Sequence, residues 1–138
     1  MAIGDCRIID LPKIQDHRGN LTFVESNRHV PFEIRRTYFL YDVPAGAARA
    51  AHGHKALRQL MIAMSGSFNI TLDDGHEKKS FHLNRPYAAL YIPPMIWRDL
   101  DEFSTGAVCL VLASEFYDEA DYFRDYNEFV AAAEGHLI

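Results

Sequence analysis

The stretch Arg49-Ala-Ala-His-Gly-His-Lys-Ala-Leu-Arg-Gln-Leu-Met-Ile-Ala-Met-Ser-Gly66 decides how the rest of the chain is interpreted. It places His52 and His54 two residues apart, ahead of Gln59 and an apolar run that stops at Gly66. Side chains of an extended strand alternate between its two faces, so we expect both imidazoles to project from the same face. The stretch therefore predicts two titratable rings in one apolar interior.

The spacing within this stretch resembles the first signature of the cupin barrels. His-x-His is followed after four residues by Gln59, where cupins usually carry Glu, and Gly66 follows after six more. The resemblance implies a jelly-roll β-barrel of the cupin (RmlC-like) type.

Short alternating segments separated by turn residues cover most of the chain. Turns are expected at residues 16–20, 42–46 and 73–75, the last a tight hairpin turn. Strands are expected at residues 21–25, 34–41, 59–64, 67–72, 79–83, 87–92 and 107–113, besides the histidine strand. Such a series predicts an all-β barrel or sandwich. Within 34–41, Arg36, Tyr38 and Leu40 share one face, and Tyr38 contributes to a site only if that face meets the histidines.

The C-terminal segment changes to helical spacing. With Asp118 as its N-cap, an apolar helical face is predicted to run up to a stop at Gly135. The members of that face are Tyr122, Tyr126, Phe129 and Val130. We expect this α-helix to pack on the outside of the barrel with its aromatic rings buried. No linker or repeat interrupts the chain, so residues 1–138 are predicted to form a single domain.

Length and composition fit one folded domain. The 138 residues are 49% hydrophobic and 12% aromatic, which excludes a disordered chain. No stretch is long enough to cross a bilayer, and the N-terminus lacks the charge order of a signal peptide, so we expect a cytoplasmic protein. Cys6 and Cys109 lie far apart in apolar stretches and are expected to be buried thiols outside any disulfide.

The formal net charge of -5 argues against a nucleic-acid-binding surface. A small anionic ligand needs only a few local arginines. The candidates near the expected strands are Arg18, Arg35, Arg36, Arg49, Arg58 and Arg98. Of these, Arg35 and Arg58 are interpreted as solvated charges at strand edges.

The second cupin signature, Pro-x-Gly-x-x-His, decides the question of a metal. Pro93 aligns with its proline, but Met95 replaces the glycine and Arg98 occupies the histidine position. A guanidinium cannot bind a metal, and Gln59 is a poor ligand, so only the two histidines of the usual set remain. Since a catalytic metal commonly needs three protein ligands, the sequence predicts no metal and no cofactor.

Two imidazoles, a tyrosine and fixed cations around one cavity suit proton transfer next to a carbonyl. A neutral histidine removes the α-proton, and a cation or a hydrogen-bond donor stabilises the enolate oxygen. The alternative is a pair of core histidines satisfied by their neighbours. For His-x-His followed by this gapped signature we favour the chemical interpretation.

Further motifs run along nearly the whole chain. They are Asp16-x-Arg-Gly-x-Leu, Pro-Phe-x-Ile-x-Arg-x-Tyr38, Arg49-x-x-His-x-His-Lys, Gly-Ser-Phe-x-Ile-x-Leu-Asp-Asp-Gly75, Leu-Tyr-Ile-x-Pro-x-x-Trp97 and Val-Leu-Ala-Ser-Glu-x-Tyr-Asp-Glu-x-Asp-Tyr122. Together they resemble the sugar 3,4-ketoisomerases of the WxcM-like family, small cupins that act on dTDP-4-keto-6-deoxyglucose. The resemblance implies a metal-free isomerase that moves the ketone from C4 to C3 through an enediol. It also implies a homodimer with exchanged N-terminal strands and a role in making deoxysugars for surface polysaccharides, such as the O-antigen of lipopolysaccharide, or for antibiotics.

The same resemblance assigns roles to individual residues. His54 is expected to take the C3 proton and His52 to return a proton, with the reverse assignment left open, and Tyr38 to lie beside the hexose. Contacts to pyrophosphate or sugar oxygens are expected from Arg18, Arg36, Arg49, Gln59 and Arg98. Arg18 favours the galacto product and Arg98 the gluco product, so the configuration at C4 stays open.

Three other functions compete with this one. A dTDP-sugar 3,5-epimerase shares the barrel and the substrate but relies on a His–Asp dyad and a tyrosine, a pattern that the sequence around His52 does not show. A non-catalytic nucleotide-sugar-binding cupin would bind without turnover, and a cupin oxygenase would hold a metal.

Overall fold

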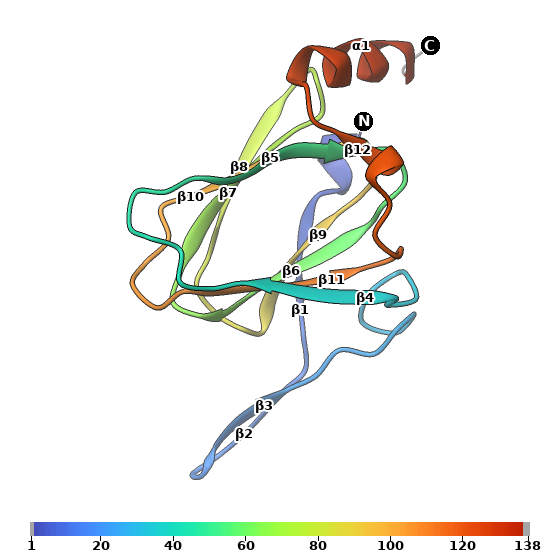
Figure 1. Cartoon of the computed structure of the whole chain (residues 1–138). Coiled ribbons are helices and arrows are strands. Elements are labelled where there is room, and N and C mark those ends of the chain that lie inside the picture. Colours follow the sequence, from blue (N-terminus) through green and yellow to red (C-terminus); the bar gives the residue numbers. More distant parts are fainter. Residues whose placement is uncertain (1, 137–138) are drawn as a thin grey trace.

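The computed structural model describes residues 2–136, which fold into two facing β-sheets with a helix at the C-terminal end (Figure 1). One sheet has the order β1 (Arg7–Asp10), β9 (Ala88–Ile92), β6 (Gln59–Ser65), β11 (Val108–Ala113), β4 (Arg36–Leu40). The other has the order β12 (Tyr122–Phe123), β5 (Arg49–His54), β10 (Trp97–Asp101), β7 (Phe68–Asp73), β8 (Lys78–Leu83). From β4 to β12 the chain alternates between the two sheets, except that β7 and β8 form a hairpin within the second sheet. The expected all-β jelly-roll barrel with a C-terminal helix is confirmed.

The main core lies between the two sheets. In β7, Phe68, Ile70 and Leu72 are buried while Asn69 and Thr71 are half-exposed, so the alternation predicted for residues 67–72 is confirmed. These three side chains belong to a large apolar cluster that includes residues of β6, β9, β10 and β11. Burial of this apolar surface holds the sheets face to face and fixes the strands that carry the polar groups described below.

The N-terminal region departs in part from the prediction. The turn expected at 16–20 is confirmed at His17 and Arg18, but the strand expected at 21–25 lies earlier, as β3 (Gly19–Thr22). It pairs with a strand that was not expected, β2 (Lys13–Asp16), in a separate antiparallel hairpin. Figure 1 shows this hairpin projecting away from the barrel. Two large apolar side chains on it, Ile14 and Leu21, are more than half exposed.

The histidine strand β5 carries an irregularity just before His52. Ala50 and Ala51 have φ angles of 76° and 57°, in the left-handed region that side chains other than glycine rarely adopt. The ladder between β5 and β10 shifts at the same place, so that Arg98 lies opposite His52 while Asp99 lies opposite Ala50. Ala51 is therefore the extra residue of a β-bulge, a feature that re-aims neighbouring side chains.

The C-terminal helix is confirmed, but its predicted start at Asp118 is wrong. Asp118 instead caps the short 3₁₀ helix η2 (Glu119–Asp121), accepting a hydrogen bond from the Ala120 amide at 3.0 Å. The next two residues form β12, which pairs Tyr122 with His54 and Phe123 with Gly53. Tyr122 therefore belongs to a strand, because its pairing with β5 overrides its helical spacing from Tyr126.

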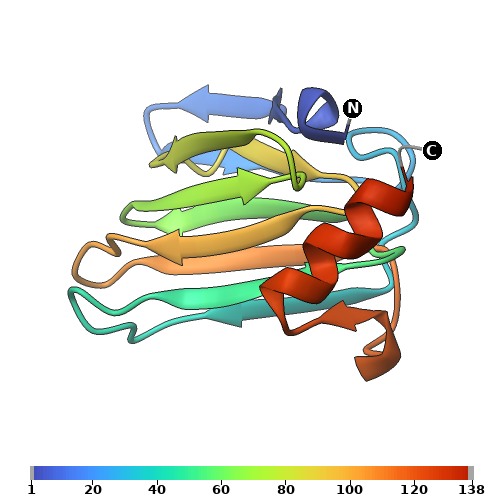
Figure 2. The same ribbon diagram turned by 90° about the horizontal axis from the view of Figure 1, so that it is seen from above.

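The helix α1 (Tyr126–His136) begins after Asp125, whose carboxylate accepts hydrogen bonds from the backbone amides of Asn127 and Glu128. It runs through Gly135, which was expected to end it. Figure 2 shows α1 lying obliquely across the outside of the second sheet. Its fully buried Phe129 packs on Trp97 and Phe123, with ring centroids 5.9 and 5.5 Å apart, so packing outside the barrel is confirmed.

The two cysteines are buried, and neither takes part in a disulfide within the described chain. Burial raises the pKa of Cys6 to about 11 and that of Cys109 to about 12. Both thiols therefore stay protonated at neutral pH. In residues 2–136 no helix combines the length and the apolar character that a membrane span requires.

Candidate active site

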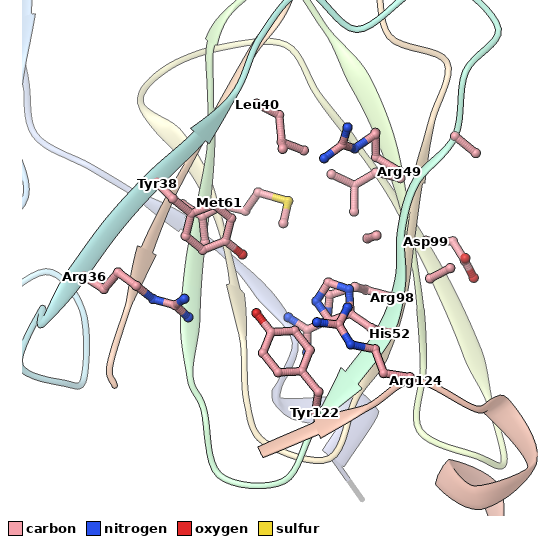
Figure 3. A pocket seen from close by; sticks show the side chains of 15 residues that line it. Arg36, Tyr38, Leu40, Arg49, His52, Met61, Arg98, Asp99, Tyr122 and Arg124 are labelled. Atoms are coloured by element: carbon pink, nitrogen blue, oxygen red, sulfur yellow. The ribbon is translucent and has the colours of Figure 1, made fainter. Parts of the chain in front are cut away.

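A cavity of about 480 Å³ opens between the two sheets (Figure 3). Its wall includes Arg36 and Tyr38 from β4, Arg49 and His52 from β5, and Arg98 from β10. The face predicted for Arg36, Tyr38 and Leu40 thus meets the histidine strand, which was the condition for a role of Tyr38. Figure 3 shows the Tyr38 hydroxyl, the His52 ring and the Tyr122 hydroxyl pointing into the same space.

The two imidazoles are in contact, as the strand alternation predicts. Their ring centroids are 4.9 Å apart with the ring planes nearly perpendicular. His52 lines the main cavity, whereas His54 is 1% exposed and lies beside a neighbouring cavity that Tyr117 and Asp121 also line. The Tyr122 ring covers both, with its centroid 5.2 Å from that of His52 and 4.3 Å from that of His54.

Asp121 orients His54, and the sequence analysis missed it. One Asp121 carboxylate oxygen lies 3.0 Å from His54 Nδ1, and the other accepts a hydrogen bond from the Ala56 amide at 2.8 Å. A carboxylate only accepts, so the proton of the neutral ring sits on Nδ1 and Nε2 carries a lone pair. The structure thus contains a His–Asp pair, which the sequence around His52 did not reveal.

Both histidines are neutral at physiological pH. Burial, followed by the positive charge of Arg98, lowers the pKa of His52 to about 4. The same two causes, in the same order, hold the pKa of His54 well below its usual range. In the part of the chain that the structure describes, the Nε2 atoms of both rings are buried without a hydrogen-bond partner. Each ring is therefore able to accept a proton from a ligand.

Arg98 is a buried cation between the two sheets. Its side chain is 1% exposed, and it donates from Nη1 to the Gln59 side-chain oxygen and from Nη2 to the Ile96 carbonyl at 2.9 Å. Burial lowers its pKa to about 10, so it keeps its charge at neutral pH. Both of these acceptors are neutral groups, so the cation favours negative charge that develops in the adjoining cavity.

Gln59 lies behind the cavity wall, although we expected it to contact the substrate. Its side chain is 0% exposed, and the amide nitrogen donates to the Tyr38 hydroxyl at 2.8 Å. It thereby links Tyr38 to Arg98 across the barrel interior.

Arg18 lies outside the cavity. It stands at the turn of the projecting β2–β3 hairpin with 80% of its side chain exposed, and it forms an ion pair with Asp16 at 2.8 Å. Arg35 and Arg58 behave as the surface charges we expected, since Arg35 pairs with Glu33 and Glu115 and Arg58 bonds to the Pro31 carbonyl. Of the arginines predicted to bind the ligand, the single chain brings Arg36, Arg49 and Arg98 together.

The segment after η2 adds two cavity residues that the sequence analysis placed in the predicted helix and gave no role. Tyr122 and Arg124 line the main cavity, and the Arg124 guanidinium lies 3.9 Å from the centroid of the Tyr122 ring. Glu119 holds Arg124 there by two hydrogen bonds of 2.9 Å. The motif that ends in Asp121 and Tyr122 contributes to the family resemblance, but its last residues overlap the predicted helix and their positions alone assign them no role in the site.

No three side chains of His, Cys, Asp or Glu within residues 2–136 gather as the ligands of a metal ion would. The positions that complete the cupin ligand set are occupied by Gln59 and Arg98, which are bonded to each other.

Comparison with known proteins places the chain in a family. Residues 4–134 match the family described as FdtA: WxcM-like, C-terminal. The chain belongs to this family. A curated relative from Aneurinibacillus thermoaerophilus, a TDP-4-oxo-6-deoxy-alpha-D-glucose-3,4-oxoisomerase, is 39% identical over 123 residues, which cover 89% of this chain and 88% of the relative.

Solved structures agree with the assignment to the family. The WlaRB TDP-quinovose 3,4-ketoisomerase from Campylobacter jejuni is 48% identical with a TM-score of 0.88, covering 92% of this chain and 98% of its own. A histidine-to-asparagine variant of the 3,4-ketoisomerase QdtA from Thermoanaerobacterium thermosaccharolyticum, in complex with TDP-4-keto-6-deoxyglucose, is 38% identical with a TM-score of 0.93. That match covers 96% of each chain.

Proposed function

We propose that the protein is a dTDP-sugar 3,4-ketoisomerase, which shifts the ketone of dTDP-4-keto-6-deoxy-D-glucose from C4 to C3. The observation that carries the proposal is a pair of neutral, touching imidazoles beside the buried cation of Arg98; their buried Nε2 atoms have no hydrogen-bond partner among residues 2–136. Relatives that are 38–48% identical over most of the chain and act on such sugars support the choice of reaction.

The reaction needs two proton movements. A base removes the proton on C3, the electrons form a C3–C4 double bond, and the ketone oxygen at C4 becomes an enediol oxygen. The hydroxyl at C3 then loses its proton and becomes the new ketone, while C4 takes up a proton. No other reactant is required, because C3 and O3 each lose one proton while C4 and O4 each gain one.

His54 is proposed as the base and His52 as the group that returns the proton. The Asp121 carboxylate keeps the proton of His54 on Nδ1, which leaves Nε2 as the acceptor. His52 lines the cavity and would reach the sugar from its wall. Arg98 and the Tyr38 hydroxyl are proposed to stabilise the enediol oxygens.

The arginines on the cavity wall are proposed to hold the substrate. Arg36, Arg49 and Arg124 all line the cavity, and a guanidinium binds the oxygens of a diphosphate in bidentate fashion. An anionic ligand can bind here although the net charge of the chain is negative, because binding depends on the charge around the cavity.

We propose a homodimer with exchanged N-terminal strands. The β2–β3 hairpin projects from its own barrel and exposes Ile14 and Leu21, which a second copy would bury. In such a dimer Arg18 would complete the partner's cavity and contact the substrate there. We also propose that the enzyme acts in the cytoplasm, where nucleotide sugars are made. There it would supply a 3-keto sugar for amination on the way to the O-antigen of lipopolysaccharide or another surface polysaccharide.

Incubation with dTDP-4-keto-6-deoxyglucose in deuterated water tests the reaction. The NMR spectrum of the product should show a ketone at C3 and deuterium at C4. The rival 3,5-epimerase is favoured by one observation, the His54–Asp121 pair, and it predicts deuterium at C5 instead. Binding without any label would indicate a non-catalytic protein. The same spectrum gives the C4 configuration, on which Arg18 and Arg98 make opposite predictions.

A further inference from the structure

Three polar side chains form one hydrogen-bonded series behind the cavity wall. Arg98 of β10 donates to the side-chain oxygen of Gln59 in β6, and the Gln59 amide nitrogen donates to the hydroxyl oxygen of Tyr38 in β4. Gln59 is fully buried and does not line the cavity, so it acts on a ligand only through its two neighbours.

The chemistry of these groups fixes which one donates and which one accepts in each hydrogen bond. A guanidinium has donors and no acceptor, so Gln59 must turn its oxygen toward Arg98. Its amide nitrogen therefore faces Tyr38, whose oxygen must accept. A phenol has one proton, and this proton is left for an acceptor other than Gln59. The Tyr38 hydroxyl points into the cavity, where a ligand oxygen would lie (Figure 3).

We propose that Gln59 is a positioning residue, which passes the donor-only character of Arg98 on to Tyr38 and so keeps the Tyr38 O–H directed at a substrate oxygen. The inference rests on the proposed isomerase function, because the acceptor is the ketone oxygen and the enediol oxygen that forms from it. A donor aimed at that oxygen stabilises the negative charge that appears when C3 loses its proton.

The amide at position 59 is essential to this arrangement. A glutamate would have nearly the same shape, but both of its oxygens accept hydrogen bonds. It would bind Arg98 with one oxygen and take the Tyr38 proton with the other, leaving only Tyr38 lone pairs toward the cavity. Burial raises the pKa of Tyr38, so the hydroxyl stays protonated at neutral pH and only its direction would change.

The test is a double-mutant cycle with Gln59→Glu and Tyr38→Phe, measured at about pH 8, where both histidines are neutral. Alone, Gln59→Glu should lower kcat roughly 10²-fold, the usual effect of losing one donor to a developing oxyanion. The affinity for TDP, measured by titration calorimetry, should stay near that of the wild type. In the Tyr38→Phe background the same substitution should lower kcat much less, because the hydroxyl is gone and only the effect of the added charge beside Arg98 remains.

Two more variants separate the effect of the Tyr38 O–H direction from the effects of added charge and of misfolding. Asn84→Asp makes the same amide-to-acid change at an exposed position before β9 and should leave kcat unchanged. Gln59→Met adds no charge and leaves the Tyr38 hydroxyl free to turn, so it should lower kcat less than Gln59→Glu does. If Gln59→Glu fails to fold, Gln59→Met is compared in the wild-type and Tyr38→Phe proteins instead. A loss of kcat that needs the Tyr38 hydroxyl would again support the positioning role.

An equal loss of kcat in the Tyr38→Phe background overturns the positioning role, as does a Gln59→Glu enzyme with wild-type kcat. Both results require a wild-type protein that turns over the keto sugar, so they leave the proposed function standing. A wild-type protein that binds dTDP-4-keto-6-deoxyglucose without converting it overturns the proposed function, and the role of Gln59 falls with it.

Discussion

At the scale of single residues, Arg98 adds to the effect of burial on the protonation of the two histidines. It is a buried cation whose described hydrogen bonds go to the neutral Gln59 side chain and Ile96 carbonyl, and its field reaches both imidazoles. Removing a charge from water is costly, so its retention in the interior is explained better by chemistry than by stability. Together with burial it keeps two histidines in the basic form without any need for alkaline conditions.

The low pKa of His52 predicts an unusual pH profile. Because the folded pKa is depressed to about 4, the neutral form persists as pH falls through the range where an ordinary histidine protonates. We expect kcat/KM to stay level on the acid side down to about pH 5 and to fall only as pH approaches 4. In Arg98→Met the acid limb should move to higher pH, though only in part, because burial is the larger cause. An acid limb near pH 6.5 in the wild type would contradict this account.

The His54–Asp121 pair predicts a loss of activity in Asp121→Asn. With the asparagine oxygen on the Ala56 amide, its NH₂ group would face His54 Nδ1 and force the ring proton onto Nε2, which then cannot accept. We expect kcat to fall roughly 10²-fold or more with little change in TDP affinity. Asp118→Asn, three residues away, is the matched control, because asparagine also caps η2 well. Equal losses in the two variants would show that the effect is structural.

At the scale of elements, the short strand β12 brings the chemistry of the C-terminal segment to the histidines. It is only two residues long, yet its pairing with β5 places Asp121, Tyr122 and Arg124 at the cavities. Helix α1 holds this strand in place through Phe129, which packs on Phe123 and Trp97. The Gly53 backbone allows this approach, since a Cβ there would lie 3.2 Å from the Phe129 ring.

Phe129→Ala therefore should lower both stability and activity. Removing a fully buried phenylalanine costs about 3–5 kcal/mol of unfolding free energy, measurable by urea denaturation. Because α1 would no longer press on β12, kcat should also fall at temperatures where the variant remains folded. Asn127→Ala, at an exposed position of the same helix, should change stability by less than about 0.5 kcal/mol. Full activity in the folded Phe129→Ala protein would show that β12 does not depend on the helix.

The elements that the sequence predicted well are those whose signal is local. Alternation in β7 and the two-residue spacing of His52 and His54 depend on neighbours alone, and both were predicted correctly. Tyr122 was placed in the helix because it lies four residues before Tyr126, a helical interval, whereas its strand forms through contact with His54. Asp121 meets His54 across 67 residues of sequence, and no local pattern encodes that distance.

At the scale of the whole molecule, the hairpin and the cavity of one chain are separated. Arg18 lies on the projecting hairpin, while the other arginines proposed to bind the ligand line the cavity of the barrel. The sequence identified Arg18 as a candidate from its motif, but a motif does not say which copy of the chain receives the side chain. The exchanged dimer proposed above would bring this residue to the cavity of the second copy.

This arrangement predicts complementation between two inactive variants. Arg18→Ala lacks the arginine that its partner would receive, and His54→Asn lacks the proposed base of its own cavity. Co-expression should produce mixed dimers in which the cavity of the Arg18→Ala chain receives Arg18 from the His54→Asn chain. Such a cavity is complete, so the ketoisomerase activity of the mixture should exceed that of either variant alone. Light scattering of the purified mixture checks the dimer, and activity no higher than that of the better variant would mean that Arg18 does not act across the dimer.

The left-handed alanines before His52 bear on how this enzyme would respond to selection. Replacing Ala50 or Ala51 by glycine would relieve about 1–2 kcal/mol of backbone strain, but it would also give the unfolded chain freedom worth roughly 0.4–1 kcal/mol. Those contributions offset each other only in part, so a laboratory screen for heat tolerance would find glycine neutral to mildly stabilising at both positions. A screen for turnover would find both positions constrained, because a glycine there would let the backbone before His52 adopt several conformations. Selection for thermal stability and selection for turnover would therefore favour different residues at these two positions.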